Sequence, residues 1–322
     1  MDITVIVPCF NSEKTLKRCL DSLLKQTMPV IIFVINDGSC DCTQEIANRY
    51  AAQYPNVKVY SQENKGLPKT RLAGLQRVST KYVGFVDSDD WVDEEMFETL
   101  HQLSEKYHSE ISACGMTWCN KKTKRRVQKE YCINGVCALS ILHTRKGINA
   151  SMCNKLFLTE FAKKLLFSTG NIAGEDYMTL TSRIEKANQV AVTNLPLYHY
   201  IMRFDSMCHR GYDEQKRKSL DNYIELYDRY SQGHSAEQCA EMRCYLCDEY
   251  LGIYASMIRN SNYDSDAIAY ITQFFSNNKA LFLKNSIISL RSRASVWMVL
   301  SMPWLFRLLY KFYNQVLMTV CR

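Results

Sequence analysis

Three aspartates stand within four residues of the sequence, at Asp87, Asp89 and Asp90, directly after the apolar run YVGFV. Carboxylate oxygens are the ligands that Mg²⁺ and Mn²⁺ prefer, and such a cation can bridge to phosphate oxygens. A solvated acidic turn has the same composition, but this cluster follows a segment that is typical of a buried strand. The spacing therefore indicates a divalent-metal site, with the solvated turn as the alternative.

Two further acidic signals are placed where they could act together with this cluster. Asp37 ends the apolar run VIIFVIND, and Gly38 permits a tight turn directly after it. Glu175 and Asp176 follow Gly174 at the predicted start of a helix, where carboxylates stabilise the positive end of the helix dipole. One of the pair could instead be a general base that takes a proton from a hydroxyl group. The residues alone leave both interpretations open.

The first half of the chain alternates strand patterns with helix patterns. Strands are expected at residues 3–10, 30–37, 57–62 and 82–87. Strands that are apolar throughout and separated by helices are typical of a parallel sheet that is covered on both faces. Ligands bind outside the carboxyl ends of the strands in such sheets, which is where Asp37 and Asp87 lie. The chain has no GxGxxG turn and no GxxxxGK loop, so the phosphates of a bound nucleotide would need another partner.

The alternation weakens from about residue 110, and from about residue 212 the pattern is mostly helical. We therefore predict a domain over residues 1–211, with halves of about 1–115 and 116–211, followed by a helical region over 212–322. A composition of 47% hydrophobic and 23% charged residues is ordinary for a folded protein and argues against global disorder.

The C-terminal segment over about residues 294–320 is rich in aromatic residues. Residues 294–306 carry no charge, but this run is shorter than the ~20 residues of a spanning helix and contains Pro303. The aromatic residues are interspersed with arginine and lysine: Trp297, Trp304, Tyr310, Phe312 and Tyr313. This mixture favours a segment that lies in a membrane interface. The alternative is a helix that packs on the protein's own core.

A net charge of +7 includes one dense basic run, Lys121, Lys122, Lys124, Arg125 and Arg126. The run is either a solvated hairpin tip or a site of attraction for anionic headgroups or phosphate. No aromatic residue interleaves with it and no recognition motif accompanies it, so a nucleic-acid partner is not expected.

Fourteen cysteines are scattered without a regular frame, and the N-terminus reads as a strand rather than as a leader. Free thiols in a reducing cytoplasm are therefore expected rather than disulfides. His234, Cys239, Cys244 and Cys247 could ligate zinc, but they lack the second CxxC pair of a typical structural site.

Seven motifs occur in a defined order over about residues 2–210: TVIVPCFN, INDGS, ENKGLPKTRLAGL, FVDSDDW, NKLF, GEDYMT and YHYIMRFDS. Together they resemble the family 2 glycosyltransferases, which include many enzymes of bacterial surface-polysaccharide assembly. The resemblance implies the GT-A fold, a Rossmann-like α/β nucleotide-binding domain with a mainly parallel central sheet. Here a mostly helical C-terminal region would follow that domain.

The resemblance also implies a set of residues that bind the nucleotide sugar: Pro8, Phe10, Asn11, Asp37, Lys65, Gly66, Arg71, Asp87, Ser88, Arg203 and Ser206. Pro8, Phe10 and Asn11 match the loop beside the base and ribose, and Asp37 matches the residue that reads the base, usually uracil. Lys65, Gly66 and Arg71 match the segment that lines the sugar pocket, and Arg203 and Ser206 fall near the diphosphate. Leu72 stands where many relatives have asparagine, and Pro68 and Lys69 stand where they have small residues.

The metal and the catalytic base are implied in the same way. Asp87 and Asp89 resemble the DxD pair, one contacting the ribose and the other a Mg²⁺ or Mn²⁺ ion. Asp90 is the alternative metal ligand, because related enzymes differ in register. Asp176 matches the catalytic base, and Glu175 beside it would touch the acceptor or donor sugar.

The implied reaction is inverting transfer of a sugar from a nucleotide donor, with UDP expected, to a hydroxyl of a glycan or lipid-linked glycan. The expected location is cytoplasmic and peripheral on the inner face of the cell membrane. One alternative is a catalytically inactive relative that acts as a scaffold in polysaccharide assembly. A sugar-phosphate nucleotidylyltransferase is a weaker alternative, since VPCFNSEKT lacks the glycine-rich loop of that class.

Overall fold

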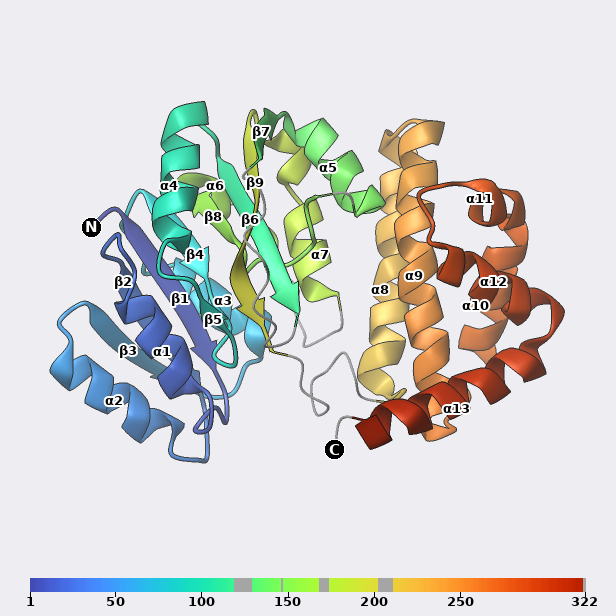
Figure 1. Ribbon diagram of the computed structural model, residues 1–322, viewed down its shortest axis with the longest axis horizontal. Helices are drawn as coiled ribbons and strands as arrows, with labels where there is room; N and C mark the ends of the chain where they lie inside the picture. The colour runs from blue at the N-terminus through green and yellow to red at the C-terminus, as the bar shows by residue number, and fades with distance from the viewer. Residues whose placement is uncertain (119–128, 146, 168–173, 202–210, 321–322) are drawn as a thin grey trace. The chain divides into compact units, whose positions relative to one another are not determined.

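A computed structural model describes residues 1–118, 129–145, 147–167, 174–201 and 211–320. Within these residues the chain divides into two compact units (Figure 1). The first unit comprises Met1–Leu142 and Lys146–Met202, and the second comprises His143–Arg145 and Arg203–Arg322. The boundary expected near Gly211 stays a prediction, because residues 202–210 lie outside the described part of the chain.

The first unit is built on one sheet, which has nine strands in the part of the chain that the structure describes. Their order is β3-β2-β1-β4-β8-β6-β9-β5, and β7 also pairs with β9. The strands are β1 Ile3–Cys9, β2 Ile31–Asp37, β3 Val57–Gln62, β4 Tyr82–Phe85, β5 Trp91–Val92, β6 Ile111–Trp118, β7 Glu130–Ile133, β8 Lys155–Leu158 and β9 Val190–Tyr200. The expected α/β class with a mainly parallel central sheet is confirmed.

The four N-terminal strands of the path are parallel, in the order β3-β2-β1-β4. Every residue of β1 is buried, which explains its continuous apolar sequence. The helices along this part of the chain are α1 Leu16–Leu24, α2 Thr43–Gln53, α3 Leu67–Leu75, α4 Met96–Tyr107, α5 Gly135–Thr144, α6 Thr159–Ala162 and α7 Glu175–Thr181. Helix α3 packs on β1 and β2, and Gly74 allows the close approach. A Cβ at Gly74 would lie 2.7 Å from a side-chain carbon of Ile6.

Beyond β4 the sheet becomes mixed. Strand β8 pairs antiparallel with both β4 and β6, in the register Gly84↔Leu156 and Ser112↔Leu156. An antiparallel neighbour begins where β4 ends, so the loop that leads into β8 lies at the carboxyl end of β4. This topology brings residues 149–154 to the edge where the acidic turn follows β4.

The second unit is helical, as expected: α8 Glu214–Gly233, α9 Ala236–Asn260, α10 Ser265–Asn277, α11 Lys279–Lys284, α12 Leu290–Ser301 and α13 Pro303–Val320. Helix α9 begins with a capping box, in which the side chains of Ser235 and Gln238 each accept the backbone N–H of the other residue. Aromatic side chains form its core, among them the fully buried Tyr250, Phe275 and Phe282. None of the helices that the structure describes is both long enough and apolar enough to cross a membrane.

Candidate active site

A buried arginine lies at the centre of the predicted site. Arg71 projects from α3, and its side chain is 3% exposed. Its Nη2 lies 2.9 Å from Oδ1 of Asp87, and its Nη1 lies 2.5 Å from Oδ1 of Asp176 and 3.4 Å from Oε1 of Glu175. Burial alone would lower the pKa of Arg71, but the charges of Asp176 and Asp87 outweigh it and raise this pKa well above its usual value. The structure therefore joins three of the predicted carboxylates through one cation.

Asp37 holds the start of the helix that carries this arginine. Its carboxylate accepts hydrogen bonds from the backbone N–H groups of Lys65 at 2.9 Å and Gly66 at 2.8 Å, and from Gln62 Nε2 at 2.7 Å. Gly66 precedes α3 at a φ of 87°, in the region that favours glycine. Asp37 therefore fixes the turn from which α3 begins, while the Lys65 side chain remains exposed.

The predicted base, Asp176, is held at both oxygens. Its Oδ1 receives the bond from Arg71, and its Oδ2 accepts the backbone N–H of Met152 at 3.1 Å. The carboxylate is nevertheless 25% exposed, so a substrate can reach it. Its position at the first turn of α7 also places it at the positive end of that helix.

A buried lysine organises the loop that supplies the Met152 N–H group. Lys155 is 0% exposed, and its Nζ donates to the Asn149 carbonyl at 2.9 Å, the Ser151 carbonyl at 2.5 Å and Asn154 Oδ1 at 2.9 Å. Burial lowers the pKa of Lys155 to about 8. The lysine thus ties residues 149–154 into one arrangement beside Asp176.

Glu175 is more deeply buried than its neighbour. Its side chain is 8% exposed, and burial raises its pKa to about 8 despite the opposing charge of Arg71. Its Oε2 is buried and has no hydrogen-bond partner among the residues that the structure describes. The charges of Asp176 and Asp87 act in the same direction as burial, so this pKa favours a protonated Glu175 near pH 7.

The acidic turn after β4 places its three aspartates in different surroundings. Asp90 is buried, and its carboxylate accepts the Tyr198 hydroxyl at 2.5 Å and the Ile201 N–H at 2.8 Å. Burial, with the charges of Asp87 and Asp89, raises the pKa of Asp90 to about 8. Asp89 is half-buried, and its backbone carbonyl accepts Arg18 Nη2 at 2.6 Å.

Ser88, between these aspartates, is buried and shares a 2.7 Å hydrogen bond with the hydroxyl of Ser12. This bond connects the acidic turn to the loop after β1. In that loop Asn11 adopts a positive φ of 49°, and its Oδ1 accepts the backbone N–H of Cys40 at 3.0 Å. Pro8 is buried within β1, and Phe10 is 49% exposed. The loops after β1, β2 and β4 therefore form one connected edge of the sheet.

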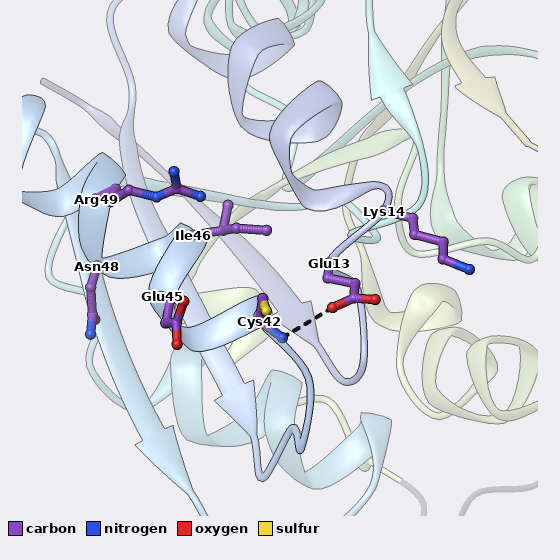
Figure 2. A pocket seen from close by; sticks show the side chains of 7 residues that line it. All are labelled: Glu13, Lys14, Cys42, Glu45, Ile46, Asn48 and Arg49. Atoms are coloured by element: carbon purple, nitrogen blue, oxygen red, sulfur yellow. Dashed lines mark hydrogen bonds between the residues drawn. The ribbon is translucent and has the colours of Figure 1, made fainter.

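An open hollow of about 740 Å³ lies near this edge (Figure 2). It is lined by Glu13, Lys14, Cys42, Glu45, Ile46, Asn48 and Arg49, and the Cys42 N–H donates to Glu13 at 3.2 Å. None of the residues predicted to bind the nucleotide sugar lines this hollow, so we do not assign the donor site to it.

Some predicted residues lie outside the described part of the chain. These are Arg203 and Ser206, and the basic run Lys121, Lys122, Lys124, Arg125 and Arg126. Conversely, the structure adds Met152, Lys155 and Tyr198, to which no role was assigned from the sequence. Lys155 lies in the motif NKLF and Tyr198 in the motif YHYIMRFDS. Membership of these motifs is the signal in the sequence that could have marked both residues as part of the site.

A divalent cation fits the chemistry of the acidic turn, provided that the donor substrate completes its coordination. Among the described residues no group of three or more His, Cys, Asp or Glu side chains converges to hold a metal by itself. Mg²⁺ is commonly held by one or two carboxylates together with substrate phosphates. Asp87 and Asp89 can supply those carboxylates, whereas both oxygens of Asp90 are engaged by Tyr198 and Ile201.

Residues 4–165, about half of the chain, match the model of Glycosyl transferase family 2. The chain therefore belongs to this family, and the resemblance of its motifs is confirmed. GlyA, a glycosyltransferase of Streptococcus pneumoniae, is 31% identical over 219 residues, which cover 64% of this chain and 31% of GlyA. EpsJ of Bacillus subtilis, named an uncharacterized glycosyltransferase, is 28% identical over 289 residues, which cover 85% of this chain and 83% of EpsJ.

The fold is similar to that of solved glycosyltransferase structures. Residues 1–349 of TarS from S. aureus, solved in complex with UDP-GlcNAc, match with a TM-score of 0.60 at 19% identity. The match covers 93% of this chain and 91% of that one. At this identity the likeness establishes the shared fold.

Proposed function

We propose that this chain transfers a sugar from a UDP sugar to a hydroxyl of a glycan or lipid-linked glycan, with inversion at the anomeric carbon. The observation that carries this proposal is the Arg71 cluster, which joins the first aspartate of the acidic turn to the carboxylate in the base position. Family membership supplies the reaction class.

Asp176 acts as the general base. Arg71 and the Met152 N–H group each hold one oxygen of its carboxylate, so its orientation is set before a substrate binds. The acceptor hydroxyl gives its proton to Asp176 while its oxygen forms a bond to the anomeric carbon. The bond from that carbon to the diphosphate breaks, and UDP leaves with the electron pair. A single displacement inverts the anomeric centre and requires no covalent enzyme intermediate.

The donor binds along the edge formed by the loops after β1, β2 and β4. Pro8, Phe10, Asn11 and Asp37 surround the base, and the UDP-GlcNAc complex of TarS supports uridine as that base. Lys65, Gly66 and Arg71 line the sugar pocket, and Ser88, Arg203 and Ser206 complete the donor set. Glu175, beside Asp176 in α7, contributes to the acceptor or donor sugar site.

Asp87 and Asp89 would hold Mg²⁺ or Mn²⁺ together with the diphosphate of the donor. The cation, when bound, stabilises the negative charge that develops on the departing diphosphate. We assign the metal contact to Asp89 rather than Asp90, because Asp89 is half-buried at the turn while Asp90 is committed to Tyr198 and Ile201. Asp87 would contact the ribose of the donor.

Surface polysaccharide is the proposed product, in line with the type of family 2 enzyme that the motifs of the chain resemble. A lipid-linked acceptor would place the enzyme at the inner face of the cell membrane, as a cytoplasmic, peripheral protein.

A panel of nucleotide sugars, read out by UDP release with Mn²⁺ or Mg²⁺, tests this function. Asp176→Asn should bind UDP sugar as the wild type does and transfer about 10²–10⁴ times more slowly, the range that general acid–base catalysis contributes. Asp2→Asn, an exposed carboxylate at the chain start, serves as the matched control. Near-normal turnover of Asp176→Asn would refute the base assignment. If the wild type neither released nor bound UDP, the scaffold alternative would replace the proposal.

A further inference from the structure

The last 44 residues of the chain carry its whole net charge. Residues 279–322 contain no Asp or Glu and seven basic residues: Lys279, Lys284, Arg291, Arg293, Arg307, Lys311 and Arg322. The chain as a whole has 40 Lys and Arg against 33 Asp and Glu, so residues 1–278 are formally neutral. Six of these seven basic residues lie on helices α11, α12 and α13, and Arg322 lies outside the described residues.

Exposed apolar side chains gather on the same elements. Of the thirteen large hydrophobic side chains that are exposed among the described residues, seven lie on α12 and α13: Leu290, Trp297, Trp304, Leu308, Leu309, Phe312 and Tyr313. Trp304, Leu308 and Phe312 recur at four-residue spacing, so they share one face of α13, and each is 59–66% exposed. Such a face is unusual for a helix that covers only its own core.

The opposite face of α13 packs inside the helical unit, which is drawn in orange and red in Figure 1. Phe306 is buried, with its ring 5.8 Å from that of Tyr254 on α9. Tyr310 accepts a 3.0 Å hydrogen bond from Arg259 of α9. On α12, Val296 and Val299 are buried while Trp297 is exposed. Helix α13 therefore packs on the core by one face and exposes the other.

Basic side chains flank the apolar face. Lys311 is exposed and precedes Phe312 directly, and the guanidinium of Arg291 lies 5.1 Å from the ring centre of Tyr313. Apolar and aromatic residues that enter the boundary of a bilayer, with basic residues beside them at the level of the headgroups, are typical of interfacial helices. Each basic residue near the surface strengthens binding to an anionic membrane by on the order of fivefold.

We infer that the exposed face of α12 and α13 docks on an anionic lipid surface, with Trp304, Leu308 and Phe312 inserted between headgroups and Lys311 and Arg291 on phosphates. A second copy of this chain is a poorer partner, because the two faces would bring like charges together without an acidic residue on either to compensate. This inference extends the proposed function by naming what retains the enzyme at a membrane. It depends on the surface chemistry of the helices and is testable without donor or acceptor.

Co-sedimentation of the full chain with vesicles tests the inference. We expect strong binding to vesicles of phosphatidylcholine mixed with phosphatidylglycerol, weak binding to phosphatidylcholine alone, and a decrease with added salt. Trp304→Ser combined with Phe312→Ser should reduce binding to the anionic vesicles by at least about tenfold, because two exposed aromatic groups no longer enter the interface. Lys311→Gln should reduce it by about fivefold at low salt.

Two matched controls lie on the first unit. Leu166→Ser removes an apolar side chain that is 72% exposed, and Lys164→Gln removes an exposed lysine; both variants should bind vesicles as the wild type does. UDP release with a water-soluble acceptor separates a docking defect from a loss of transfer. Equal vesicle binding by the wild type and the Trp304→Ser/Phe312→Ser variant would overturn the inference. The inference would also be overturned if the wild type formed a dimer and bound no vesicles, and if the two substitutions converted that dimer to a monomer. The face would then be a protein interface.

Discussion

Nη1 of Arg71 lies 2.5 Å from Oδ1 of Asp176, although the two residues are separated by 105 positions in the sequence. The same guanidinium reaches Asp87 through its other terminal nitrogen at 2.9 Å. A planar guanidinium can serve two carboxylates at once in a fixed geometry, which a lysine ammonium does not reproduce. Arg71 therefore sets the spacing between the proposed base and the acidic turn.

Replacement of Arg71 should separate its electrostatic role from its geometric role. We expect Arg71→Lys to fold but to transfer sugar about 10² times more slowly, since one ammonium cannot hold both carboxylates at their present distances. Arg71→Met should lower the free energy of unfolding by about 1–3 kcal/mol, because the partly exposed carboxylates of Asp87 and Asp176 lose their charged hydrogen-bond donor. Denaturant unfolding and UDP release measure the two effects.

Arg77→Lys is the control for these variants, because Arg77 lies just beyond the same helix and is exposed. It should alter neither unfolding nor transfer by more than about 0.5 kcal/mol. If Arg71→Lys transferred sugar at the wild-type rate, the two-carboxylate geometry would have no part in catalysis.

The raised pKa of Glu175 predicts how stability depends on pH. Between its usual value of 4.5 and about 8, the unfolded chain releases the proton of Glu175 while the folded chain retains it. The unfolded state therefore binds fewer protons in this window, and the contribution of Glu175 to the free energy of unfolding falls as pH rises. The slope from one such group is at most about 1.4 kcal/mol per pH unit.

Glu175→Gln should remove this contribution, because glutamine resembles the protonated carboxyl group and does not titrate. We expect unfolding free energies of the variant to vary less between about pH 5 and pH 8 than those of the wild type. Glu160→Gln changes an exposed glutamate and should leave the pH dependence as it is. Parallel profiles for Glu175→Gln and the wild type would mean that Glu175 is ionised in the folded protein.

The strand ends were predictable from the sequence, and the contacts across them were not. Asp37 and Asp87 follow apolar runs whose pattern reveals buried strands, and parallel strands present their carboxyl ends at one edge. The antiparallel entry of β8 between β4 and β6 carries no such local signal, because a strand's own residues do not specify its neighbour. The Met152 N–H contact to Asp176 depends on that entry and was therefore missed.

The choice between Asp89 and Asp90 was open in the sequence for a similar reason. Both are acidic residues in one turn, and nothing local distinguishes them. Asp90 is engaged by Tyr198, near the end of β9, and by Ile201, directly after β9. Both residues lie more than 100 positions later in the sequence.

Paired substitutions in the acidic turn should therefore differ in their effect on the metal requirement. Asp89→Asn should raise the Mn²⁺ concentration needed for half-maximal UDP release by about tenfold or more, because it removes a charged oxygen ligand. Asp90→Asn should leave that concentration unchanged, since asparagine can still accept the Ile201 N–H bond. Electron paramagnetic resonance of Mn²⁺ with UDP present provides a reading of the same difference without turnover.

Asp90→Ala extends this comparison to stability. It leaves the buried Tyr198 hydroxyl and the Ile201 N–H group without acceptors, at a cost of about 1–3 kcal/mol each. The reverse pattern, in which Asp90→Asn loses Mn²⁺ and Asp89→Asn retains it, would transfer the ligand role to Asp90.

Lys155 offers the last test, because its side chain holds the loop that orients Asp176. Lys155→Met keeps the volume of the side chain but leaves acceptors on Asn149, Ser151 and Asn154 without their shared donor. We expect the loop to lose its fixed form, so that the Met152 N–H group no longer orients the base. The rate of transfer at saturating substrates should fall by about tenfold or more, whereas the KM for the donor should change little. Lys163→Met, an exposed lysine after α6, should change neither quantity.

Partial unfolding of Lys155→Met would lower the active fraction of that variant without altering the donor KM or the pH profile of the molecules that remain folded. The positioning role therefore requires a second reading, which is faster hydrogen exchange at the Met152 amide of Lys155→Met in a protein whose β1 amides remain protected. Unchanged exchange at Met152, with turnover reduced, would remove the loop from the explanation.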